Sequence, residues 1–264
     1  MKKLLPILLF CSLVLAACGG PEATEPAATE SSVEPVTETT VLTTAPVLIP
    51  TTPPEPEHSA LYILGVDVED VILWFKEVCL NAEFVNSGNP SFLQKWADPI
   101  RYHIHGEPTA DDLAVLESFA QWLNCQEGFP GICEATEQPE ANLNIYFCSQ
   151  EELIGHLGDN FYGTDGGVTF WYDGNDQIYD AIICIRTDLN QHLRNSVILE
   201  ELYNGLGPIQ DTDLREDSLI YAGFSEPQEL TEIDKLILQL LYHPEMQCGM
   251  SAAQCEEVIR RLYY

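Results

Sequence analysis

Four polar residues, Glu200, Glu201, Asn204 and Gln210, follow one another closely enough to share one site. Zinc prefers imidazole, thiolate or carboxylate ligands, so Glu200 carries a suitable donor. Asn204 and Gln210 offer only amide oxygens, which suit calcium or magnesium better than zinc. Glu201 has the side chain of a general base, but it has no activated water to act on unless a metal supplies one. The residue types therefore favour a polar cluster over a zinc centre.

A helix must position these side chains, and the pattern predicts a long one from about Leu189 to Gly205. Glu200 and Asn204 lie four positions apart, so a helix points them in the same direction. We expect them to form a polar cluster that faces a cleft. The alternative is that Glu200 and Glu201 serve only helix packing and contact with solvent.

The segment from Glu200 to Asp211 resembles the metzincin zinc-peptidase motif, H-E-x-x-H-x-x-G-x-x-H. The resemblance places Glu201 at the general-base glutamate and Gly207 at the turn glycine. The three metal-ligating histidines are replaced, by Glu200, Asn204 and Gln210. Asp217 to Tyr221 resembles the segment around the metzincin Met-turn, with Ile220 in place of the methionine. The resemblance implies a metallopeptidase fold whose zinc ligands are replaced and whose catalytic activity is lost.

A second resemblance has several parts: Glu200 to Gly207, Ser218 to Tyr221, Leu230 to Asp234, Leu241 to Pro244, and Gly249-Met250. With these motifs, residues from about 60 to 255 look like an uncharacterised family of bacterial lipoproteins, a domain of unknown function. This likeness implies a fold but no activity.

The rest of the domain predicts an α+β fold with one mixed sheet and a mostly helical C-terminal part. Alternating apolar residues predict strands at 100–104, 143–147, 168–172 and 178–185. Capping patterns predict helices that begin near Asp67, Thr109, Ser149, Thr231 and Ser251. The order of these elements resembles the upper half of the metzincin fold, in which a long helix of the active-site type follows the sheet.

Residues 1–17 have the form of a secretory signal peptide, because two lysines precede an apolar stretch too short to span a bilayer. Cys18 follows small residues and resembles a lipobox cysteine, which implies lipidation, with acyl chains such as palmitate anchoring the chain to a membrane. The alternative is an ordinary signal peptide with an incidental cysteine. Residues 18–58 then form a tether rich in Pro, Thr and Glu, which we expect to be disordered. The globular domain spans 59–264, outside the cytoplasm.

The net charge and the cysteines limit which partners and which cellular compartment the sequence is compatible with. The net charge is −31, which disfavours nucleic acid as a partner. Seven cysteines follow Cys18, and outside the cytoplasm they can pair. Spacing suggests disulfides between Cys125 and Cys133 and between Cys248 and Cys255, although spacing does not fix connectivity. No two cysteines have the C-x-x-C spacing typical of zinc sites.

Three functions are compatible with these patterns. The first is non-catalytic binding of a peptide or protein by a peptidase-like domain, with the ligand extended beside 168–172 by strand addition and with no cofactor. The alternative is an active metal-dependent peptidase with atypical ligands and Glu201 as its base, and only this alternative uses zinc. The third is an envelope interaction protein that binds through its acidic surface. The histidines elsewhere in the domain are not expected to supply zinc ligands: His103, His105, His156, His192 and His243.

Overall fold

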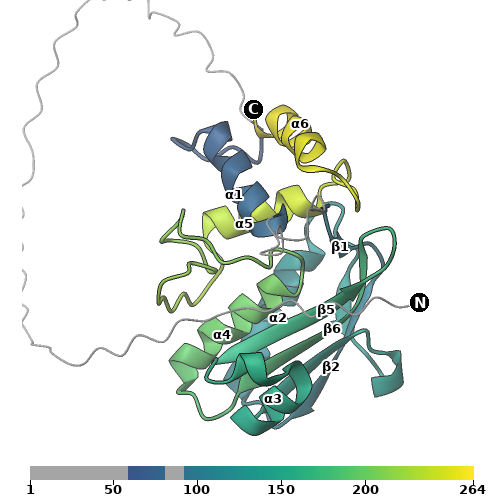
Figure 1. Ribbon diagram of the computed structural model, residues 1–264, viewed down its shortest axis with the longest axis vertical. Helices are drawn as coiled ribbons and strands as arrows, with labels where there is room; N and C mark the ends of the chain where they lie inside the picture. The colour runs from purple at the N-terminus through teal and green to yellow at the C-terminus, as the bar shows by residue number, and fades with distance from the viewer. Residues whose placement is uncertain (1–58, 81–91) are drawn as a thin grey trace, which may run out of the picture. The chain divides into compact units, whose positions relative to one another are not determined.

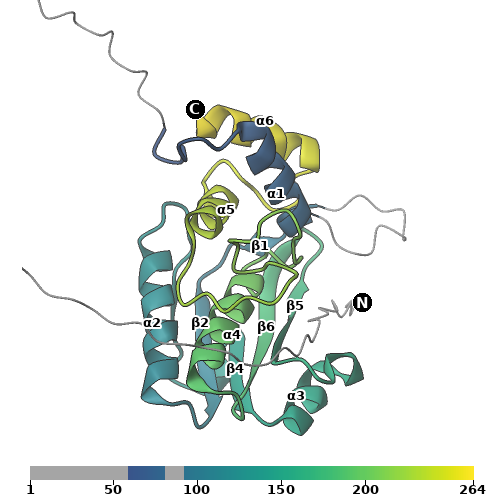
Figure 2. The same cartoon turned by 90° about the vertical axis from the view of Figure 1, so that its left-hand side faces the viewer.

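The computed structural model describes residues 59–80 and 92–264, where one β-sheet is combined with six α-helices (Figures 1 and 2). The fold is mixed α and β, as the sequence predicts. The expected signal peptide and tether, Cys18 included, lie outside the described residues. None of the helices in the two described ranges combines the length and hydropathy that a membrane crossing requires.

The helices are α1 (Val68–Leu80), α2 (Ala110–Asn124), α3 (Gln150–Leu157), α4 (Gln191–Asn204), α5 (Glu232–Tyr242) and α6 (Ala252–Tyr263). Reciprocal caps begin several of them. The Thr109 hydroxyl accepts from the Asp112 N–H, and the Asp112 carboxylate accepts from the Thr109 N–H. Ser149 with Glu152 and Thr231 with Asp234 repeat this arrangement at α3 and α5. These local patterns are the reason that the helix starts are predictable from sequence.

The strands are β1 (Lys95–Trp96), β2 (Ile100–Gly106), β3 (Ile132–Glu134), β4 (Leu143–Cys148), β5 (Gly166–Tyr172) and β6 (Gln177–Arg186). Strands β3, β2, β4 and β6 lie side by side and run parallel. The short β1 pairs with the start of β6, also in parallel. Strand β5 runs antiparallel along β6. Within the described part of the chain, no strand pairs with the other edge of β5.

Helices cover both faces of the sheet. A Cβ added at Gly166 of β5 would meet Val197 and Glu201 of α4, whereas one added at the neighbouring Gly167 would meet Leu157 of α3. Successive residues of a strand face opposite sides, so α4 and α3 lie on opposite faces. Helix α2 packs beside α4 (Figure 2). Helix α4 therefore packs on the face of the sheet toward which Gly166 of β5 points, and the candidate site lies there.

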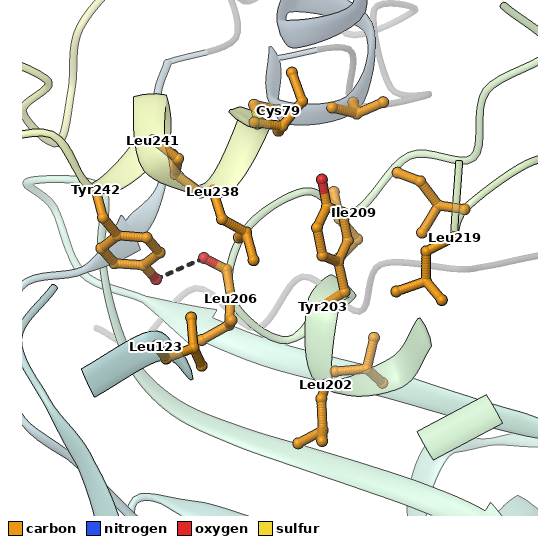
Figure 3. Close-up of a cluster of buried hydrophobic side chains, with 14 of the residues drawn as sticks. Cys79, Leu123, Leu202, Tyr203, Leu206, Ile209, Leu219, Leu238, Leu241 and Tyr242 are labelled. Atoms are coloured by element: carbon orange, nitrogen blue, oxygen red, sulfur yellow. Dashed lines mark hydrogen bonds between the residues drawn. The ribbon is translucent and has the colours of Figure 1, made fainter. Parts of the chain in front are cut away.

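A second layer of apolar packing fixes the C-terminal end of α4 (Figure 3). The Tyr242 hydroxyl of α5 donates to the Leu206 carbonyl at 2.8 Å, and the Tyr203 hydroxyl of α4 donates to the Asp234 carbonyl at 3.4 Å. Both tyrosines are buried, with side chains from α1 and α5 around them. Burial of such large aromatic groups, with their hydroxyls satisfied, holds α4 firmly against α5.

The two ends of the described domain are joined to each other. The Tyr263 hydroxyl in α6 donates to the Val66 carbonyl at 3.1 Å, and the Ser59 hydroxyl donates to the Tyr263 carbonyl at 3.0 Å. Tyr263 is fully buried, and α6 lies alongside α1 (Figure 1). An ion pair between Arg260 and Glu69 links the same two helices.

The disulfides suggested by spacing are not formed, since all seven cysteines of the described residues are free thiols. Cys125 caps the end of α2 and Cys133 lies in β3, where both are exposed to solvent. Cys255 is fully buried in α6, while the Cys248 thiol lies 3.5 Å from the carbonyl oxygen of Lys95. The expectation from spacing is therefore wrong, because helix packing directs these side chains to different surroundings.

Candidate functional site

The predicted helix lies beside a cavity of about 110 Å³ between α4, the start of β5 and the loop that follows α4. Four acidic residues line it: Asp165, Glu200, Glu201 and Asp211. Its apolar wall comes from Leu193, Val197, Leu219, Tyr221 and Phe224. No lysine or arginine is among the lining residues, all of which belong to the described range. The cavity thus combines a cluster of carboxyl groups with an apolar wall.

Helix α4 places Glu201 against the sheet. The side chain is only 3% exposed, and its Oε2 atom has no hydrogen-bond partner. This close approach requires a glycine in β5, because a Cβ at Gly166 would lie 2.8 Å from Glu201 Oε1 and 2.6 Å from Val197 Cγ1. Glu200 is adjacent in the helix, half-buried at the cavity wall. A buried acceptor without a hydrogen-bond partner is unusual, because its lost hydration is not compensated.

Asp211 reaches the cavity because the chain folds back after α4. The Thr212 N–H donates to the Ile220 carbonyl at 2.9 Å, so the residues after α4 run beside 218–221. The carboxylate of Asp234, at the start of α5, accepts from the Leu219 N–H at 3.0 Å and from the Ser218 hydroxyl at 2.8 Å. The Asp234 carboxylate therefore anchors the turn at 218–221, and two residues of this turn, Leu219 and Tyr221, line the cavity.

Three of the cavity's carboxyl groups, those of Asp165, Glu200 and Glu201, have raised pKa values. Burial, followed by the nearby charges of Asp211 and Asp165, raises the pKa of Glu200 to about 8. Burial and then the charge of Glu200 raise the pKa of Glu201 well above its usual range. Burial also raises the pKa of Asp165, although the Arg186 guanidinium lies 3.2 Å away. Such a group of carboxyls favours a proton or another cation in its midst.

The structure brings together only part of the predicted cluster. Glu200 and Glu201 both line the cavity, but Asn204 does not. Asn204 is fully buried one turn later in α4, and neither atom of its amide has a hydrogen-bond partner. Gln210 is also not among the residues that line the cavity. Its backbone N–H donates to the backbone carbonyl of Val78 in α1 at 3.3 Å.

Two further residues that the resemblance singled out, Gly207 and Ile220, serve the backbone turn and the packing of the core. Gly207 has a φ of +127°, and a Cβ there would lie 2.8 Å from the Gln94 carbonyl oxygen, so this turn requires glycine. Ile220 is buried at 1% exposure in the turn between the lining residues Leu219 and Tyr221. Neither Gly207 nor Ile220 is among the residues that line the cavity.

The donor set does not fit zinc. Of the three positions that correspond to histidine ligands, only Glu200 lines the cavity, and the other two carry amides directed elsewhere. Across residues 59–80 and 92–264, no three His, Cys, Asp or Glu side chains are grouped so that they could hold a metal ion.

Asp165 and Asp211 are the functional candidates that sequence reasoning missed. Asp211 directly follows the motif, but only the pairing of Thr212 with Ile220 brings it back toward α4. Asp165 lies in the glycine-rich stretch before β5. The one available signal was the pair Gly166-Gly167 beside this aspartate, since paired glycines in a strand often mark a close approach by another group.

Comparison with known proteins gives a family and no activity. No curated protein matches this sequence. A family model described as "Protein of unknown function (DUF2927)" matches residues 69–261, a range that contains every residue lining the cavity. The match agrees with the expected resemblance to an uncharacterised domain and covers most of the chain. The chain belongs to the DUF2927 family.

Proposed function

We propose that this domain is a non-catalytic, peptidase-like module that binds an extended peptide or protein segment along β5. The observation that carries the proposal is the edge of β5 beside the acidic cavity, with which no strand of the described residues pairs. A second support is the scattering of Asn204 and Gln210 away from that cavity, which leaves Glu201 without a metal-activated water.

The backbone of β5 supports strand addition. The Arg186 N–H donates to the Asp165 carbonyl at 3.1 Å, and hydrogen-bonded pairs alternate along an antiparallel ladder. The alternate residues Gly166, Val168 and Phe170 therefore direct their N–H and C=O groups away from β6. A segment that pairs with this edge completes those hydrogen bonds and gains specificity from its side chains.

A metzincin-like frame is part of the proposal. Helix α4 carries the two glutamates beside the sheet, and Gly207 provides a turn with positive φ after it. The segment 218–221 lies at the same cavity as these glutamates. These features support descent from a peptidase architecture that has kept its cleft and has lost its metal ligands.

The proposal also includes a place in the cell. Residues 1–17 would direct export, lipid on Cys18 would anchor the mature chain to a membrane, and 18–58 would hold the domain away from that surface. The domain would then meet its peptide or protein partner in the cell envelope. The net charge of −31 argues against a nucleic-acid partner there.

Binding and turnover on the same peptides test this proposal. Purified full-length chain is mixed with a mixed-sequence library of strand-length peptides. Bound peptides are identified after capture, cleavage is followed by mass spectrometry, and metal content is measured on protein prepared without chelator. We expect binding, no cleavage and no stoichiometric metal. N-methylation at alternate backbone positions of a bound peptide should weaken its binding, because it removes the donors that face β5.

Two results would replace the proposal. Chelator-sensitive cleavage with a stoichiometric metal would favour the alternative, an active metal-dependent peptidase in which Glu201 acts as the general base. Binding that is lost on charge reversal of acids on the outer surface, and is indifferent to N-methylation of the peptide, would favour an envelope protein that uses its acidic surface.

A further inference from the structure

The cavity beside β5 has unused capacity for a positively charged group. Glu201 is 97% buried, its Oε2 faces no hydrogen-bond donor, and it lines the cavity together with Glu200 and Asp211. Asp165, which also lines the cavity, forms an ion pair with Arg186. An enclosed carboxylate oxygen without a donor is costly, and a bound cation with N–H groups would satisfy it.

The size and shape of the cavity favour an organic cation over a metal ion. Its volume of about 110 Å³ is several times what one water or one small ion occupies. The acidic side chains of the described residues are not grouped for metal coordination. Leu193, Val197 and Leu219 add an apolar wall that suits a methylene stem. Lysine and arginine combine such a stem with a charged, hydrogen-donating end.

The position of Gly166 connects this cavity to the proposed peptide path. Gly166 is the first residue of β5, it lines the cavity, and its backbone N–H and C=O point away from β6. Its Cα faces α4, toward Glu201. Side chains of an added strand also alternate between the two faces. A ligand residue that lies beside Gly166 on the α4 face therefore directs its side chain into the cavity.

We propose that the cavity is a subsite for one lysine or arginine side chain of the peptide or protein that binds along β5. The apolar wall holds the stem, and the carboxyl groups of Glu200 and Glu201 give up their protons to solvent as the cation enters and then accept hydrogen bonds from its charged end. This subsite rests on the proposed peptide-binding function and specifies its ligand.

Matched peptides test the subsite on the purified full-length chain. A strand-length peptide rich in threonine and valine carries lysine, arginine, glutamine or norleucine at its central position, and affinity is measured by fluorescence anisotropy. We expect the lysine and arginine peptides to bind about tenfold more tightly than the norleucine peptide, as charge-assisted hydrogen bonds in an enclosed site provide. Glu200→Gln and Glu201→Gln should erase this preference and leave binding of the norleucine peptide in place.

Glu151→Gln is the matched control, since Glu151 is exposed on α3 and the substitution removes the same charge. A competition on the unmodified chain needs no variant: n-butylamine should displace the lysine peptide, and n-butanol should not. Equal affinity for lysine and norleucine peptides, or a preference that survives both cavity variants, would overturn the subsite and leave peptide binding along β5 standing. Failure of every peptide to bind would overturn the proposed function itself.

Discussion

Glu200 is a carboxyl group at a crowded cavity wall, where burial and the charges of Asp211 and Asp165 raise its pKa to about 8. In the unfolded chain its pKa returns to the ordinary value near 4.5. The folded state therefore holds a proton that the unfolded state releases between these two pKa values. The protonated Glu200 makes its full contribution to the free energy of unfolding below about pH 4.5. That contribution is lost as the pH rises toward about 8.

Glu200→Gln should remove this dependence on pH. The variant should be more stable than the unmodified chain near pH 8 by an amount on the order of a few kcal/mol, with the difference shrinking as the pH falls toward 5. Urea unfolding at several pH values, with peptide absent, measures the difference. Glu151→Gln, at an exposed position, should leave the pH dependence unchanged. A stability difference between Glu200→Gln and the unmodified chain that does not grow as the pH rises from 5 to 8 would contradict the assignment.

The candidate site was predictable only where its residues lie on one helix. Glu200 and Glu201 share α4, so their spacing in sequence already placed them together. Asn204 follows the same periodicity, yet it lies at the end of the helix, where it is fully buried and does not line the cavity. Asp211 could not be predicted, because its position depends on backbone pairing between two loop segments.

At the scale of elements, a buried ion pair joins α2 to α4. The Arg194 guanidinium of α4 donates to Asp112 at 2.8 Å, and the Gln191 side chain donates to the same carboxylate at 2.6 Å. Asp112 is 1% exposed and also completes the cap of α2 with Thr109. One carboxylate therefore fixes the N-terminal ends of both helices on this face of the sheet.

Asp112→Asn should destabilise the domain by about 3 kcal/mol, because it leaves the Arg194 charge buried without its partner. The free energy of unfolding from urea titration measures the loss. Asp111→Asn changes the same charge at the preceding, exposed position and should shift stability by no more than about 0.5 kcal/mol. Equal effects of the two substitutions would show that the ion pair does not hold α2 to α4.

Elements with strong local signals were predictable, and pairings across the chain were not. Capping residues such as Thr109 and Thr231 define helix starts within a few positions, and the structure confirms them. Strands β1 and β3 are too short to show an alternating pattern, so the sequence did not indicate them. The disulfide expectations failed for a related reason: spacing reports the length of a loop and carries no information on the direction of the two side chains.

For the whole molecule, the test of anchoring is chemical. If Cys18 is the lipidated residue, cells that produce the full chain should incorporate labelled palmitate into it, and Cys18→Ala should abolish the label. Cys11→Ala is the matched control, since it removes another cysteine of the N-terminal segment and should keep the label. Gel fluorography after immunoprecipitation provides the measurement, and label that persists in Cys18→Ala would refute lipidation at this residue.

The contact of Ser59 and Val66 with Tyr263 has a mechanical consequence. Tension drawn through an anchored N-terminal segment would reach the domain at Ser59, where α6 and its ion pair to α1 share the load. A partner held on β5 would pull instead along the strand, against many backbone hydrogen bonds in shear. If the chain is anchored to a membrane and a partner binds along β5, the force between them would pass through both the α1–α6 pair and the sheet.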